Sequence, residues 1–130
     1  MHTSNATPIR VLTVDDSASM RALLLGALTS RGFAVEQAED GQQALEMASR
    51  QHYALILMDV QMPRLNGLDA TRAIRLLPGY ADTPILAMTA NAFDEDRRDC
   101  LAAGMNDHIG KPIVPERLFA ALQRWLPPAN

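Results

Sequence analysis

The sequence predicts an α/β domain in which one sheet of five parallel strands is covered by helices on both faces. Short apolar runs alternate with amphipathic stretches along the chain, which is the pattern of successive strand–helix–strand units. The middle run, residues 54–58, is apolar at every position, as expected of a central strand buried on both faces. Five such units are too few for an eight-unit barrel, so an open doubly wound sheet is expected.

The predicted strands are short apolar runs that end in polar or turn-forming residues. They are Ile9–Val14, Phe33–Gln37, Ala54–Met58, Pro84–Met88 and a short Asp107–Gly110. An open α/β sheet binds its ligands at the carboxyl ends of the strands. Chemistry is therefore expected among the residues that follow these runs.

The first two helices are predicted by apolar spacing and by capping residues. In the first helix, apolar residues recur at helical spacing: Met20, Leu23, Leu24, Ala27 and Leu28. Leu25 lies off this stripe, so its side chain is expected to be partly exposed. Gly32 can end the first helix in a left-handed conformation. Asp40 with Gln43 resembles a capping box that begins the second helix.

The last three helices carry similar signals. Asn66 can cap the third helix, and the residues on one side of that helix are Leu68, Thr71 and Ile74 or Arg75. The acidic segment 94–96 precedes arginines at 97–98, an order that matches the dipole of a fourth helix, and Gly104 can end it. Pro115 suits the first turn of the fifth helix. The apolar stripe of that helix is Leu118, Ala121, Leu122 and Trp125.

The composition is that of one ordinary globular domain. Hydrophobic residues make up 48% of the 130 residues, charged residues make up 21%, and the formal net charge is −3. No basic patch favours direct binding of nucleic acid, and no apolar run approaches the roughly 20 residues that span a bilayer. The single cysteine, Cys100, fits a buried position in a cytoplasmic protein. We expect a flexible lead-in at 1–8, the domain at 9–126 and a tail at 127–130.

Polar residues follow four of the predicted strands. They are Asp15 and Asp16 after the first strand, Asp59 after the third, Thr89 after the fourth and Lys111 after the fifth. Each of them alone has an ordinary explanation as a helix cap, a strand-end residue or a surface charge. Because the carboxyl ends of parallel strands meet at one edge of the sheet, their joint placement instead predicts a single site.

Three clustered carboxylates repel one another unless cations lie between them. Mg²⁺ prefers oxygen ligands and typically takes one or two carboxylates with water and substrate phosphate, and Lys111 supplies a second positive charge. Such a site suits phosphoryl transfer, in which catalysis is mostly positioning and charge neutralisation. A carboxylate can itself be the nucleophile and give an aspartyl-phosphate. His108 is the only histidine near these strand ends, so no zinc site is predicted.

Four segments at the strand ends carry a resemblance to a known family. They are Val11–Ser17, Met58–Pro63 with Asn66-Gly67, Ala87–Ala90 and Lys111–Ile113. In order and spacing they resemble the receiver domains of response regulators in two-component signalling, over residues 9–126. The resemblance implies a flavodoxin-like sheet of strand order 2-1-3-4-5. It also implies a signalling phosphoacceptor rather than an enzyme, one that assists its own phosphotransfer and dephosphorylation.

The resemblance assigns roles to the acidic residues. It implies that Asp59 accepts a phosphoryl group from a phosphohistidine on a partner. It implies that Asp16 and Asp59 ligate Mg²⁺ together with the backbone carbonyl of Gln61, while Asp15 acts mainly through water. Phosphatases of the haloacid-dehalogenase type, a rival that also forms an aspartyl-phosphate, need a second aspartate where this chain has Gln61.

The resemblance also implies a switch. Thr89 and Lys111 would contact the phosphoryl oxygens, and the peptide bond between Lys111 and Pro112 would be cis. Family members commonly carry tyrosine or phenylalanine where this chain has His108, which is either part of the switch with Thr89 or a polar residue at a strand edge. Gln61 and Asn91 occupy positions that tune the lifetime of the phosphoryl group.

The amino-acid sequence of several segments is similar to that of receivers attached to hybrid sensor histidine kinases. These segments are 58–63, 70–75, 88–92 and 102–107. The implied partners are a sensor histidine kinase, a histidine phosphotransfer domain or both, with docking through the first helix and Leu25. A stand-alone regulator and a fragment of a longer kinase both remain open. A pseudo-receiver would usually lack an acidic pocket residue or the lysine, and a dinucleotide-binding fold would need a glycine-rich loop after the first strand.

Overall fold

The computed structural model describes residues 8–60, 66–90 and 94–126, with the backbone alone for 94–97. Within these ranges five strands alternate with five helices, as predicted. The strands are β1 (Arg10–Val14), β2 (Ala34–Ala38), β3 (Leu55–Asp59), β4 (Ile85–Thr89) and β5 (Asp107–Gly110). The helices are α1 (Ala18–Thr29), α2 (Gly41–Arg50), α3 (Gly67–Arg75), α4 (Asp94–Ala103) and α5 (Pro115–Trp125).

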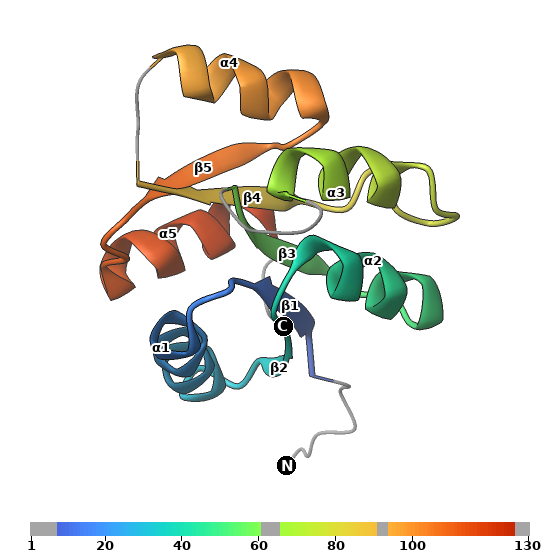
Figure 1. Cartoon of the computed structure of the whole chain (residues 1–130). Helices are drawn as coiled ribbons and strands as arrows, with labels where there is room; N and C mark the ends of the chain where they lie inside the picture. Colours follow the sequence, from blue (N-terminus) through green and yellow to red (C-terminus); the bar gives the residue numbers. More distant parts are fainter. Residues whose placement is uncertain (1–7, 61–65, 91–93, 127–130) are drawn as a thin grey trace.

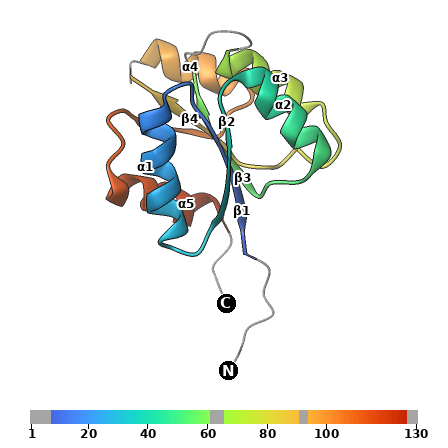
Figure 2. The same cartoon turned by 60° about the horizontal axis from the view of Figure 1, so that its bottom comes forward.

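The strands form one parallel sheet in the order β2-β1-β3-β4-β5. Helices α1 and α5 cover one face, and α2, α3 and α4 cover the other (Figures 1 and 2). Alternate residues of β3 point to opposite faces: Leu55 and Leu57 pack with α1 and α5, whereas Ile56 and Met58 pack with the other three helices. The predicted doubly wound sheet, including its strand order, is confirmed.

The element boundaries and caps follow the predictions closely. The first four strands begin one residue later than predicted, and β5 has the predicted bounds. Asn66 caps α3 by accepting a hydrogen bond from the Asp69 amide at 3.0 Å. Gly32 and Gly104 have φ values of +88° and +105°, as predicted for glycines that end helices. Cys100 is buried. No helix in the described part of the chain is long and apolar enough to cross a bilayer.

One local prediction was wrong, and a second was confirmed only in part. Leu23 was predicted to lie on the buried stripe of α1, yet it is 44% exposed. Leu24 and Leu28 occupy the centre of the buried face, and Leu23 is rotated from Leu24 by about 100° around the helix axis. In the capping box, Asp40 accepts from the Gln43 amide, but the Gln43 side chain accepts from the amide of Glu39 rather than from that of Asp40. Asp40 is extended (φ −155°, ψ 174°), so the chain enters α2 with the Glu39 amide within reach.

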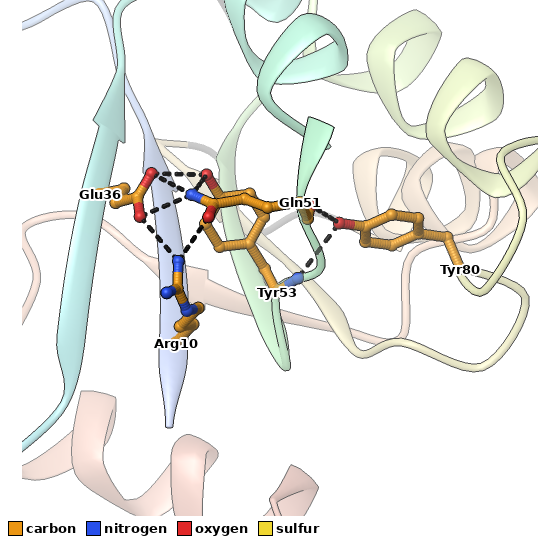
Figure 3. A network of polar contacts seen from close by, with 5 residues as sticks. All are labelled: Arg10, Glu36, Gln51, Tyr53 and Tyr80. Carbon is orange, nitrogen blue, oxygen red and sulfur yellow. Dashed lines mark hydrogen bonds and ion pairs between the residues drawn. The ribbon is translucent and has the colours of Figure 1, made fainter. Parts of the chain in front are cut away.

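A polar network joins the edge strand β2 to the start of β1 and to the segments that precede β3 and β4 (Figure 3). The Glu36 carboxylate accepts hydrogen bonds from Tyr53 Oη at 2.7 Å and Gln51 Nε2 at 2.6 Å, and it pairs with Arg10 Nη1 at 3.2 Å. The Tyr80 hydroxyl donates to the Gln51 carbonyl at 2.8 Å and accepts from the Tyr53 amide at 3.1 Å. Burial, with smaller contributions from Glu36, raises the pKa of Tyr53 to about 12. The acidic residues at the carboxyl ends of the strands, Asp15, Asp16 and Asp59, are not part of this network.

Arg75 ties the end of α3 to the turn between α4 and β5. Its guanidinium donates to the carbonyls of Tyr80, Thr83 and Gly104 at 2.6–3.0 Å and to Asn106 Oδ1 at 2.7 Å. These contacts use all five N–H groups that an arginine offers. Arg75 is therefore a structural residue, which is why an arginine can stand on the inner side of a helix.

Candidate functional site

The carboxyl ends of β1, β3, β4 and β5 bring the predicted site residues to one edge of the sheet. Asp15 follows β1, Asp59 is the last residue of β3, and Thr89 is the last residue of β4. Oxygen atoms of Asp15, Asp16 and Asp59 all lie within 4.8 Å of one another. Asp15 and Asp59 are buried, whereas Asp16 is exposed. The cluster therefore has two buried carboxylates and one that faces solvent.

Lys111 places an ammonium group between the two buried carboxylates. Its Nζ lies 3.1 Å from Asp15 Oδ2 and 3.4 Å from Asp59 Oδ1. Burial alone would lower the pKa of Lys111, but the hydrogen bond to Asp15 and the charge of Asp59 outweigh it, so the pKa lies above its ordinary value. The lysine is therefore fully charged at neutral pH and compensates two carboxylates at once.

The backbone around Lys111 has the predicted geometry. The peptide bond between Lys111 and Pro112 is cis, and the Lys111 amide donates to the Thr89 carbonyl at 2.8 Å. This hydrogen bond continues the β4–β5 pairing by one residue beyond the strand register. It holds the Thr89 backbone beside that of Lys111, so the hydroxyl and the ammonium arise from adjoining points of the sheet edge.

Asp15 is held at each of its polar groups. Its amide donates to the Ala38 carbonyl at 3.1 Å, and its carbonyl accepts from Arg21 Nη1 at 2.8 Å. Its Oδ1 accepts from the Ser17 amide at 2.9 Å, and its Oδ2 accepts from Lys111. Both carboxylate oxygens of Asp15 thus already accept hydrogen bonds.

Asp59 lies against the start of α3. The Gly67 amide donates to the Val60 carbonyl at 3.2 Å. A Cβ atom at Gly67 would lie 2.2 Å from the Asp59 carbonyl oxygen and 2.9 Å from Val60 Cα. Only glycine allows this approach, so Gly67 determines how closely α3 packs behind the strand end that carries Asp59.

The donor set fits Mg²⁺. All three clustered side chains offer carboxylate oxygens, the ligands that hard divalent cations prefer. The exposure of Asp16 leaves the open side that Mg²⁺ needs, because this ion usually retains several waters. Lys111 occupies the opposite, inner side between Asp15 and Asp59.

Gln61 and Asn91, two further predicted site residues, lie outside the described residues. His108 is described and is not part of the acidic cluster. His108 lies within β5, beside Ala87 of β4 rather than at the strand end. Its side chain is 23% exposed, with Nδ1 3.7 Å from Asp107 Oδ1, and it lines a cavity of about 140 Å³ together with Cys100, Leu101, Asn106 and Asp107.

Sequence reasoning missed Arg21 and the packing role of Gly67. A signal for Arg21 existed, because helical side chains point toward the amino end of their helix and Arg21 stands one turn inside α1. Gly67 was recognised only as part of a motif. Its steric role depends on where α3 begins relative to β3, which is a tertiary feature.

Curated relatives match nearly the whole chain. Histidine-protein kinase BarA of Escherichia coli is 39% identical over 117 residues, which are 90% of this chain and 13% of BarA. Response regulator MprA of Mycobacterium leprae is 39% identical over 118 residues, which are 91% of this chain and 51% of MprA. The chain therefore spans about half or less of the length of these relatives.

Solved structures share the fold. Chemotaxis protein CheY4 of Vibrio cholerae matches with a TM-score of 0.89 and 38% identity, over 92% of this chain and 100% of that one. The receiver domain of sensor histidine kinase PA1611 from Pseudomonas aeruginosa was crystallised with a magnesium ion coordinated in its active site cleft. It matches with a TM-score of 0.85 and 42% identity, over 92% of this chain and 98% of that one. The receiver domain of Ssk1 from Saccharomyces cerevisiae was crystallised with the histidine phosphotransfer protein Ypd1. It matches with a TM-score of 0.83 and 29% identity, over 91% of this chain and 88% of that one.

The family assignment follows from the sequence match, the sheet and the acidic edge together. Residues 11–123 match the family described as the response regulator receiver domain. This range includes Asp15, Asp16, Asp59 and Lys111, the groups that meet at the edge of the sheet. With its sheet order, its acidic cluster and its paired lysine, this chain belongs to the response regulator receiver domain family.

Proposed function

We propose that this receiver domain accepts a phosphoryl group on Asp59 from a phosphohistidine of a partner protein, with Mg²⁺ bound beside it. One observation carries the proposal: Asp59, only 4% exposed, ends the central strand within the acidic cluster and faces the ammonium of Lys111. A buried carboxylate flanked by cations is suited to attack phosphorus, because the incoming negative charge is compensated where it arrives.

The burial and contacts of the three carboxylates favour Asp59 as the nucleophile. Both oxygens of Asp15 already accept hydrogen bonds, from the Ser17 amide and from Lys111. Asp16 is exposed and precedes α1, which suits a metal ligand that also contacts water. Asp59 combines burial with a position at the strand end, where open α/β sheets bind their ligands.

The proposed transfer is an in-line displacement at phosphorus. An Asp59 carboxylate oxygen forms the new O–P bond while the N–P bond to the donor imidazole breaks, and the imidazole leaves with that electron pair. The Lys111 ammonium and the Thr89 hydroxyl hold the transferred oxygens. Asp16, Asp59 and the backbone carbonyl of Gln61 would hold Mg²⁺, which supplies charge neutralisation for the carboxylates and the phosphoryl oxygens.

We propose a phosphorelay role, with a sensor histidine kinase or a histidine phosphotransfer domain as the partner. Support comes from the similarity to BarA and from the Ssk1 receiver crystallised with Ypd1. Partners of this class act in the cytoplasm, and a single cysteine, Cys100, cannot form a disulfide within the chain, which suits a reducing compartment. The chain would then be a signalling phosphoacceptor rather than an enzyme with a diffusible substrate.

Helix α1 offers an uncharged exposed face for such a partner. The exposed residues of α1 and its C-cap are Ala18, Ser19, Ala22, Leu23, Leu25, Gly26, Thr29 and, at the cap, Ser30. On a helical wheel they form one arc with small residues in the middle and the two leucines at its edges. A helix of the partner could approach closely along the small residues. Because α1 starts beside Asp16, that approach would bring a phosphohistidine toward the acidic cluster.

Replacing Leu25 by glutamate is expected to slow phosphotransfer from a phosphorylated histidine phosphotransfer domain by about 10-fold, the effect of losing one apolar anchor of an interface. The rate with a small phosphodonor should be unchanged, since Leu25 is 38% exposed and outside the acidic cluster. Rates from both donors are compared by phosphate-affinity gel electrophoresis. Leu76→Glu, at an 87% exposed leucine after α3, is the matched control. Equal slowing with both donors would rule out docking through Leu25.

We also propose that His108 takes part in the conformational response. The cavity of about 140 Å³ beside it, lined by residues of α4, of β5 and of the turn between them, provides room for the ring to change position. We expect His108→Phe to alter the amide shifts that a phosphoryl analogue induces in α4 and β5, while shifts at Asp59 and Lys111 stay as in the wild type. An unchanged pattern throughout would leave the imidazole without a special role.

Amide NMR with Mg²⁺ and beryllofluoride, which mimics a phosphoryl group, tests the proposed function. The wild type is expected to show shifts at Asp59, Thr89 and Lys111, and Asp59→Asn is expected to show only those caused by Mg²⁺. Beryllofluoride shifts of equal size in both proteins would refute Asp59 as the acceptor.

A further inference from the structure

Arg21 contacts the acidic site through the backbone rather than through a carboxylate. It lies in the second turn of α1 and is half-buried. Its Nη1 donates to the Asp15 carbonyl at 2.8 Å, and its own carbonyl accepts from Gln37 Nε2 of β2 at 2.9 Å. One residue thus connects α1, the edge strand β2 and the turn that carries Asp15 and Asp16.

The contact falls on the peptide that leads into Asp16. A peptide group is planar, so a fixed Asp15 carbonyl also fixes the direction of the Asp16 amide and the position of its Cα atom. The Asp15 side chain has its own restraints from Ser17 and Lys111. Among residues 8–60, 66–90 and 94–126, no side-chain hydrogen bond or ion pair restrains the exposed Asp16 carboxylate in a comparable way. The direction of that carboxylate therefore depends on the backbone that Arg21 holds.

We propose that Arg21 is a positioning residue of the metal site: by holding the Asp15 carbonyl, it orients Asp16 for Mg²⁺. This inference rests on the proposed function, because it assumes that Mg²⁺ binds at the acidic cluster. Outer residues that orient metal ligands commonly change metal affinity by about 10-fold or more when they are replaced.

The sign of the effect separates positioning from simple electrostatics. Arg21 is a cation near a site for a cation, so removing its charge strengthens Mg²⁺ binding by Coulomb's law alone. Removing its hydrogen bond to Asp15 loosens the turn and weakens binding. A variant that loses both the charge and the hydrogen bond therefore binds Mg²⁺ more weakly only if positioning is the larger effect.

The experiment is a titration of the 130-residue chain with MgCl₂, monitored by the amide NMR shifts of Asp16, Val60 and Lys111. Arg21→Met and Arg21→Gln are expected to bind Mg²⁺ about 10-fold more weakly than the wild type. Arg21→Lys keeps a donor and the charge, and is expected to restore most of the affinity. Arg31→Met is the matched control, because Arg31 is an exposed arginine after α1 that stacks on Phe119. It should bind Mg²⁺ as the wild type does.

A second readout separates positioning from a general loss of structure. With a small phosphodonor, Arg21→Met is expected to raise the Mg²⁺ concentration for half-maximal phosphorylation about 10-fold, with the maximal rate within about 2-fold of the wild type. A fall in the maximal rate at saturating Mg²⁺, with no change in the half-maximal concentration, would overturn the proposal.

The outcomes also separate this inference from the proposed function. If Asp16→Asn weakens Mg²⁺ binding but Arg21→Met binds Mg²⁺ as tightly as the wild type or more tightly, Arg21 is not a positioning residue and the metal site stands. If Asp16→Asn binds Mg²⁺ as tightly as the wild type, the proposed metal site fails and this inference fails with it.

Discussion

Replacing Lys111 by methionine is expected to slow phosphorylation of Asp59 by about 100-fold or more, the usual effect of removing one charged donor from a phosphoryl or oxyanion site. The ammonium lies between Asp15 and Asp59, where it both compensates the resting carboxylates and would contact the transferred oxygens. Without it, the carboxylates repel an incoming phosphoryl group with only Mg²⁺ to offset that repulsion.

The rate is measured with a small phosphodonor at saturating Mg²⁺, so that neither partner docking nor metal affinity limits it. Arg117→Met, at an exposed position of α5, removes the same unit of charge away from the cluster and should retain the wild-type rate. A Lys111→Met rate within about 3-fold of the wild type would mean that the lysine serves only to stabilise the acidic edge.

Replacing Gly67 by alanine is expected to destabilise the fold by about 3 kcal/mol, because the new methyl group has no space. Its Cβ would lie 2.2 Å from the Asp59 carbonyl oxygen and 2.9 Å from Val60 Cα. Both are backbone atoms of the segment that holds the phosphoacceptor, so relief requires α3 or the end of β3 to move. Chemical denaturation measures the loss, and phosphorylation should slow as well because Asp59 is displaced.

Gly26→Ala is the matched control for Gly67→Ala. Gly26 lies within α1, and a Cβ there would meet no atom within 4 Å. Alanine is favoured over glycine inside helices by about 1 kcal/mol, so this variant should be slightly more stable than the wild type. If both variants have the stability of the wild type, α3 is not packed against Asp59 as closely as described.

Local patterns were sufficient to predict the elements and most of their ends. Continuous apolar character identified β3, and single residues such as Asn66 and Gly104 marked helix ends because capping depends on neighbouring residues. The misplacement of Leu23 has a similar local origin. Apolar spacing alone cannot say where the centre of a buried arc lies, and α1 is rotated so that Leu24 and Leu28 occupy it.

The acidic edge was predictable because strand order and strand ends follow from a few topological rules. The contacts that support it were not, since they join residues far apart in sequence. Gly67 matters because of where α3 packs, and Arg75 because four acceptor atoms from two turns surround it. The Tyr53–Glu36 network depends in the same way on three separate strands or loops.

The most direct test of the central claim is to identify the phosphorylated residue. Wild type and Asp59→Asn are incubated with Mg²⁺ and a small phosphodonor, and their intact masses are measured before and after treatment with hydroxylamine, which cleaves acyl phosphates. We expect the wild type to gain one phosphoryl group that hydroxylamine removes, and Asp59→Asn to gain none. A phosphoryl group of equal occupancy on Asp59→Asn, or one on the wild type that resists hydroxylamine, would contradict the assignment of Asp59.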